Sequence, residues 1–200
     1  MLNAARIRFQ SGLLFAIAFV CVGCISPKSY VDPKLPKVSY ESISPRATPA
    51  TLVLKANFQR NGENKPKLDS LVQNKAALVL RASRQFSTVQ SEPAAGADTL
   101  LLTVNNVADM AAAVGKGFGT GLTFGLAGSL VTDGYEIKAV YMPNGGKEIT
   151  KTYTHAIHTT IGNKKGPEGL QSMTPTEAFD RVVEEVVLKF VSDLKTDGVL

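Results

Sequence analysis

The chain has 200 residues, 44% of them hydrophobic, with 22 basic and 17 acidic side chains. Two of the basic residues, Arg6 and Arg8, lie among the first 23 residues, which contain no acid, so 20 basic side chains face 17 acidic ones in the remainder. An excess this small, without a clustered basic stripe, argues against a nucleic-acid partner. The two cysteines are Cys21 and Cys24, so the rest of the chain has neither a disulfide nor a cysteine-based metal site.

The first 24 residues have the layout of a secretory signal. A positive flank with Arg6 and Arg8 precedes an apolar run over residues 13–23, and Gly23 stands directly before Cys24. The run is too short to span a bilayer comfortably, because a spanning helix needs about 20 apolar residues. Gly23 followed by Cys24 resembles the lipobox of bacterial lipoproteins, although Cys21 stands where that family usually has leucine. An ordinary secretion signal and an uncleaved anchor are the alternatives.

The lipobox resemblance implies the cellular location of the protein. In this family the cysteine is acylated and becomes the first residue of the mature chain, so residues 1–23 are expected to be a signal peptide and Cys24 the lipid attachment site. Two or more acyl chains give lasting membrane attachment. Aspartate after the cysteine tends to retain lipoproteins in the inner membrane. Here Ile25 follows, so the resemblance implies the outer membrane, with the folded domain in the periplasm.

Residues 24–50 are predicted to be a flexible linker and residues 51–200 a single domain. The linker holds five prolines and many serines without a sustained apolar period. A stretch at 38–43 is the one part that could instead lie on the domain as an edge strand. About 150 residues then remain, which is the size of one ordinary domain.

Hydrophobic periodicity predicts the elements of this domain in chain order. Residues 51–58 and 86–90 have strand character, and an apolar period of three and four residues predicts a helix from about 66 to 84. The dense apolar run at 99–107 predicts an inner strand covered on both faces. Alternating residues around the Asn144-Gly145 turn predict a hairpin over 135–160.

The last predicted helix has the best-defined start in the chain. Thr174, Pro175 and Glu177 supply an N-cap hydroxyl, a first-turn proline and the glutamate of a capping box. A valine-rich apolar stripe follows up to Leu194. The order of elements predicts an α+β fold, a two-layer sandwich with a mostly antiparallel sheet of four to five strands and two main helices on one face.

Residues 111–131 form a glycine-rich segment with one charge, Lys116. Small residues at a spacing of four would let two helices approach closely, and a period of two would gather bulky residues on one strand face. Buried packing is one interpretation, and membrane or oligomer contact is the other. The spacing of the glycines matches neither a P-loop nor a dinucleotide fingerprint. The candidate contact residues are Gly117, Gly121, Gly125, Phe118, Leu122 and Phe124.

No set of residues predicts a catalytic or metal site, and no cofactor is expected. His155 and His158 are the only histidines, and in a strand their three-residue separation sends them to opposite faces. Both are expected to be surface or half-buried residues. Asp180, Glu184 and Glu185 are expected to be solvated charges on the last helix.

The sequence therefore predicts a non-enzymatic envelope lipoprotein that binds a partner protein. It is similar in design to small outer-membrane lipoproteins such as the activators of penicillin-binding proteins and the auxiliary lipoproteins of envelope transport systems. One alternative is an oligomeric channel or secretion component that uses residues 111–131, like the curli-secretion lipoprotein. Another is the binding or hydrolysis of cell-wall glycans, for which His155 and His158 are the only candidates.

Overall fold

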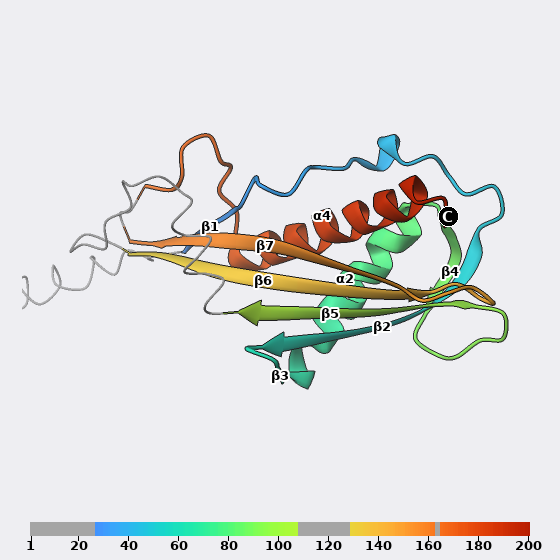
Figure 1. Cartoon of the computed structure of the whole chain (residues 1–200). Coiled ribbons are helices and arrows are strands. Elements are labelled where there is room, and N and C mark those ends of the chain that lie inside the picture. Colours follow the sequence, from blue (N-terminus) through green and yellow to red (C-terminus); the bar gives the residue numbers. More distant parts are fainter. Residues whose placement is uncertain (1–26, 108–128, 163–164) are drawn as a thin grey trace, which may run out of the picture.

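A computed structural model describes residues 27–107, 129–162 and 165–200, which form a sheet with two helices packed on one face (Figure 1). The strands are β1 (Lys28–Val31), β2 (Ala50–Arg60), β3 (Glu63–Asn64), β4 (Phe86–Gln90), β5 (Asp98–Val107), β6 (Ser129–Met142) and β7 (Ile149–Ile161). The helices are α2 (Asp69–Ala82) and α4 (Pro175–Thr196), and two short 3-10 turns are η1 (Tyr40–Ser42) and η2 (Pro66–Leu68).

The sheet has seven strands in the order β1-β7-β6-β5-β2-β3, and β4 also pairs with β2. β2 runs parallel to both β4 and β5, whereas the other pairs are antiparallel. The α+β two-layer class is confirmed, and four of the six strand pairs are antiparallel, as expected. The sheet nevertheless has seven strands instead of four to five, and it is mixed because of the two parallel pairs of β2. The β2–β4 pair is parallel because helix α2 carries the chain back to the end of the sheet at which β2 begins. Residues 91–97 return the chain in the same way between β4 and β5. The added strands β1 and β3 are too short to show a period in the sequence.

β1 lies within residues 24–50, the range expected to form the linker, and pairs with β7 at one sheet edge. Its Tyr30 is buried, and Gly166 lies so close that an added Cβ would come within 2.0 Å of the ring. The chain between β1 and β2 then runs along the outside of α4 (Figure 1). There η1 occupies half of the stretch considered as an edge strand, and the Tyr40 hydroxyl donates to Glu184 at 3.3 Å.

The core lies between the sheet and the two helices. Alternate side chains of the central strands, such as Leu54, Leu102 and Ile137, point towards the helices and are buried. The valine stripe of α4 is buried against them, as its sequence period predicts. At the start of α4 the predicted capping box is present, because Thr174 accepts from the Glu177 amide and Glu177 accepts from the Thr174 amide.

β5 is an inner strand, but in the described part of the chain helices cover only one of its faces. Its buried side chains alternate with less buried ones, and Leu101 is 41% exposed. The expectation that residues 99–107 are covered on both faces is therefore wrong. Leu101 pairs with Val140 of β6 and Lys55 of β2 on the helix-free face.

Side chains of α2 satisfy the outer edge of β2 between β4 and β3. The Gln73 amide accepts from the Ala56 N–H at 2.8 Å and donates to the Leu54 carbonyl at 2.9 Å. Asp69 accepts from the Phe58 N–H at 2.8 Å. Backbone groups that could otherwise pair with a foreign strand are therefore already satisfied.

Candidate binding groove

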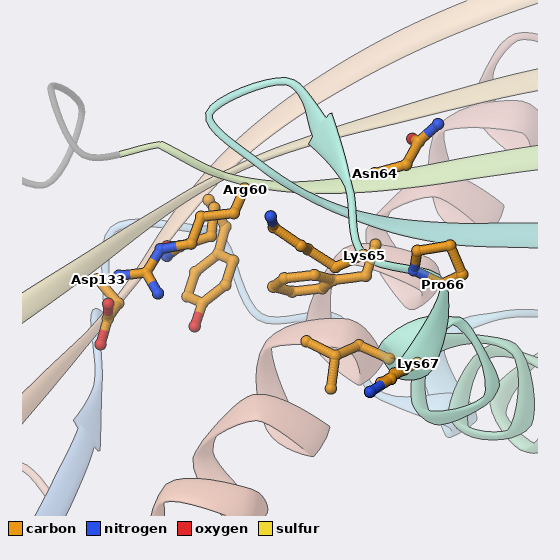
Figure 2. Close-up of a pocket in the computed structure, with 10 residues that line it drawn as sticks. Arg60, Asn64, Lys65, Pro66, Lys67 and Asp133 are labelled. Atoms are coloured by element: carbon orange, nitrogen blue, oxygen red, sulfur yellow. The ribbon is translucent and has the colours of Figure 1, made fainter.

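A groove of about 620 Å³ opens at the end of the sheet, beside the start of α2 (Figure 2). Residues from β2, β3, η2, β5 and β6 line it, and we name it the β2–β6 groove. Its lining residues are Phe58, Arg60, Asn64, Lys65, Pro66, Lys67, Leu68, Asn106, Asp133 and Tyr135. The strand register explains why these residues lie together. Arg60 of β2 is opposite Asn106 of β5, and Asn106 is opposite Tyr135 of β6, all on the helix side of the sheet.

Aromatic side chains form the floor of the groove. The rings of Phe58 and Tyr135 each lie 5.8 Å from the ring of Phe179, in the first turns of α4. Edge-to-face and tilted ring pairs of this kind are favourable and rigid. Phe58 and Tyr135 are largely buried, so the floor is an apolar surface that the protein itself holds in place.

The rim is mainly basic. Arg60 and Asp133 lie at one side of the groove and Lys67 lies beside Pro66 at the other (Figure 2). Lys65 pairs with Glu63 at 2.9 Å. Among the described residues, no carboxylate lies within 4.0 Å of the charged groups of Arg60 and Lys67. The rim therefore offers two cations without an ion-pair partner in this part of the chain.

Burial raises the pKa of the Tyr135 hydroxyl well above its usual range. The nearby Asp133 carboxylate adds to this increase and Arg60 opposes it. Tyr135 therefore stays protonated at neutral pH, and its hydroxyl can donate a hydrogen bond but cannot act as a base.

The turn between β2 and β3 positions the basic rim. Asn61 and Gly62 both have positive φ, which favours these residue types, and the turn is tied to β5 by two hydrogen bonds. The Asn61 amide donates to the Asn106 carbonyl at 2.8 Å, and the Gly62 amide donates to the Asn105 side chain at 3.0 Å. A further bond from the Lys65 amide to the Phe58 carbonyl, at 2.8 Å, fixes the approach to η2.

His155 lies on the helix side of β7 and is 4% exposed. Its Nε2 donates to the Glu185 carboxylate at 2.9 Å, and its Nδ1 accepts from the Ala156 amide at 2.9 Å. Because Nδ1 accepts, the ring proton is on Nε2. Glu185 is buried as well, so the expectation that it is a solvated charge is wrong.

His158 lies on the opposite face and is fully buried. Its Nδ1 is 3.0 Å from the Thr132 hydroxyl, and its Nε2 is 3.6 Å from Asp32. Burial lowers the pKa of His158, although Asp32 works in the other direction. The prediction of opposite faces is confirmed, but the expectation of surface or half-buried histidines is wrong. Neither histidine lines the groove.

The other candidate residues lie outside the part of the chain that the structure describes. These are Cys24, Gly117, Phe118, Gly121, Leu122, Phe124 and Gly125. Of the glycine-rich segment, only residues 129–131 are described, and they begin β6.

Within the described residues, no group of three or more histidine, cysteine, aspartate or glutamate side chains could hold a metal ion. In the same part of the chain, no helix has the length and apolar character needed to cross a bilayer.

The groove has no clear signal in the amino-acid sequence. Arg60, Lys65 and Lys67 lie close together in the sequence around a turn, which is a weak signal of a basic surface. Asp133 and Tyr135 are about 70 residues further along, and only the pairing of β2, β5 and β6 brings them to the same place.

No family model matches the chain, and no curated protein does. Among solved structures, a minor lipoprotein from Acinetobacter baumannii is 11% identical, with a TM-score of 0.38, over 74% of this chain and 94% of that one. The PelC dodecamer from Paraburkholderia phytofirmans is 14% identical, with a TM-score of 0.31 in one of its crystal forms, over 80% of this chain and 97% of that one. An uncharacterised protein is 14% identical, with a TM-score of 0.34, over 74% of this chain and 91% of that one. Similarities this low establish neither a family nor a function.

Proposed function

We propose that the chain is a lipid-anchored, non-enzymatic protein of the bacterial cell envelope whose folded domain binds a partner protein. Acylated Cys24 attaches it to the outer membrane, and residues 51–200 act in the periplasm. The β2–β6 groove is the binding site. The observation that carries the proposal is its combination of an aromatic floor with a basic rim.

The chemistry of the lining favours binding over catalysis. The groove brings together one carboxylate, Asp133, with cations, amides and rings, and Tyr135 stays protonated. General acid–base catalysis needs a group that accepts a proton near neutral pH. Rigid aromatic surface surrounded by charged groups is instead typical of the centre of a protein interface.

A photo-crosslinking amino acid at position 67, introduced in living cells, tests the proposal. We expect a discrete adduct with another envelope protein, and we expect the added Arg60→Glu substitution to weaken it. The matched control carries the crosslinker at Lys138, which is exposed on the helix-free face. An absence of adducts at position 67, or the same adducts at both positions, would contradict the proposal.

Oligomerisation through residues 111–131 is the alternative. Light scattering of the protein purified in detergent separates the two, because a ring-like assembly multiplies the mass whereas a tethered binding domain does not. An adduct between two copies of the chain at position 67 would likewise favour the alternative.

A further inference from the structure

The exposed leucines of α2 extend the apolar surface beyond the groove. Leu71 is 52% exposed and Leu78 is 62% exposed, and Leu68, which lines the groove, is 38% exposed. Lys67 and Leu68 belong to η2, which leads directly into α2, and Leu71 follows them by four and three residues. Leu78 lies two turns further along. We name Lys67, Leu68, Leu71 and Leu78 the α2 ridge.

The spacing of the ridge is that of a helix-pairing seam. Leu68, Leu71, Lys75 and Leu78 are separated by three, four and three residues, which is the a/d pattern of a coiled coil. Lys75 interrupts the pattern and pairs with Glu184 of α4 at 3.0 Å. From Leu68 to Leu78 the ridge is about 15 Å long, which matches about three turns of a second helix.

The charges near the ridge indicate the kind of partner. Arg60 and Lys67 have no carboxylate partner within 4.0 Å among the described residues, whereas Arg81 already donates to the Val89 carbonyl at 2.6 Å. Asp69, the acid of the first turn, already accepts a hydrogen bond from the Phe58 amide. Asp133 is the one acid in the groove lining, so the surface is apolar and mainly basic, and its complement is apolar and acidic.

The geometry disfavours both strand addition at this position and docking to a flat membrane surface. Gln73 and Asp69 already bond to the Ala56 and Phe58 amides and to the Leu54 carbonyl of β2, so an extended peptide would have to displace these side chains. The floor of the groove is recessed, since Phe58 and Tyr135 are largely buried, and a planar lipid surface cannot reach it.

We propose that the partner segment is an amphipathic acidic helix that lies along the α2 ridge and places one apolar side chain on the floor of the β2–β6 groove. Its acidic residues face Arg60 and Lys67. This inference rests on the proposed function and adds to it the chemistry of the partner.

Selection from a displayed library of random peptides of about 16 residues tests the inference. The target is the full-length protein purified in mild detergent, with counter-selection on a Leu71→Gln/Leu78→Gln double variant. We expect enriched peptides with net negative charge and apolar residues three and four apart. Their affinity, measured by fluorescence anisotropy, should fall about tenfold or more in the double variant and in Lys67→Glu. Leu101→Gln, which changes an exposed leucine on the other sheet face, should leave the affinity unchanged.

Three results would overturn the inference. The enriched peptides could be neutral or basic, or no peptide could distinguish the wild type from the double variant. Alternatively, vesicles containing phosphatidylglycerol could bind the wild type but not the double variant, which would make the ridge a lipid-binding surface. If any of these results occurs while crosslinking at position 67 still captures a protein, the inference of an acidic partner helix is wrong and the proposed partner-binding function stands. If crosslinking fails as well, both are wrong.

Discussion

Gln73 shows how a single side chain can complete a sheet. Its amide group bonds to two backbone groups of β2, at Leu54 and Ala56, where none of the described strands does so. Partly buried backbone groups without a partner cost free energy, so Gln73, although it is a helix residue, stabilises the sheet.

Replacing Gln73 should therefore destabilise the fold. We expect Gln73→Met to lower the free energy of unfolding by about 1–3 kcal/mol, because the Ala56 N–H and the Leu54 carbonyl lose their partners. Urea denaturation followed by circular dichroism measures the change. Asn74→Met, on the exposed side of the same helix, should have little effect. Equal losses in the two variants would show that the hydrogen bonds are not the cause.

His158 occupies a buried polar cluster on the helix-free face. Thr132 and Asp32 lie beside its ring, and Lys34 and His155 contribute smaller electrostatic effects. Burial dominates and lowers the pKa of His158 below its usual value of 6.5. The folded state therefore disfavours protonation of this ring, whereas the unfolded chain takes up a proton at the usual pKa.

This shift predicts a loss of stability in acid. As the pH falls below about 6.5, the unfolded state binds a proton that the folded state resists, by at most ~1.4 kcal/mol per pH unit. The contribution of the neutral ring is complete above this pH and declines below it. We expect the free energy of unfolding to fall less steeply between about pH 7 and pH 5 in His158→Gln than in the wild type. Parallel curves, measured by urea denaturation at each pH, would refute this origin.

At the scale of elements, α4 depends on its cap and on its packing. The helix contains many β-branched valines, which are poor helix formers, so burial against the sheet must stabilise it. Its first turn is held by the reciprocal bonds of Thr174 and Glu177.

Thr174→Ala removes the side-chain half of this capping box. We expect a loss of about 1 kcal/mol in the free energy of unfolding, since one amide of the first turn loses its partner. Thr174→Ser keeps the hydroxyl and should remain close to the wild type, as measured by thermal or urea unfolding. If the serine variant were as unstable as the alanine variant, packing of the threonine methyl group would be the cause instead.

At the scale of the whole molecule, the proposed anchor decides where the domain acts. We expect Cys24→Ser to abolish acylation and to release the protein from the membrane fraction, because under the proposed function the attached chains hold it to the bilayer. Cys21→Leu, which introduces the residue usual in the lipobox, should remain anchored and serves as the matched control. Fractionation and mass spectrometry of the N-terminal peptide measure both outcomes. Membrane retention of the serine variant would contradict lipid anchoring.

The elements with a sustained period were predictable because their pattern repeats over many residues. The helix at α2, the β6–β7 hairpin and the capped start of α4 all follow from local sequence. The two-residue strand β3 and the four-residue strand β1 were not predictable, because they exist only through pairing with β2 and β7. The same limit applied to Glu185, whose position in sequence suggested a solvated charge although His155 holds it in the core.

The amino-acid sequence alone determined the class of fold, the helix periods and the signal-like first 24 residues, because each of these features depends on residues that are close together in the sequence. The tertiary structure alone decided that the sheet is mixed, that both histidines are buried, and that Arg60, Lys67 and Tyr135 surround one groove. These features depend on contacts between residues far apart in the chain. Only strand register and helix packing create such contacts.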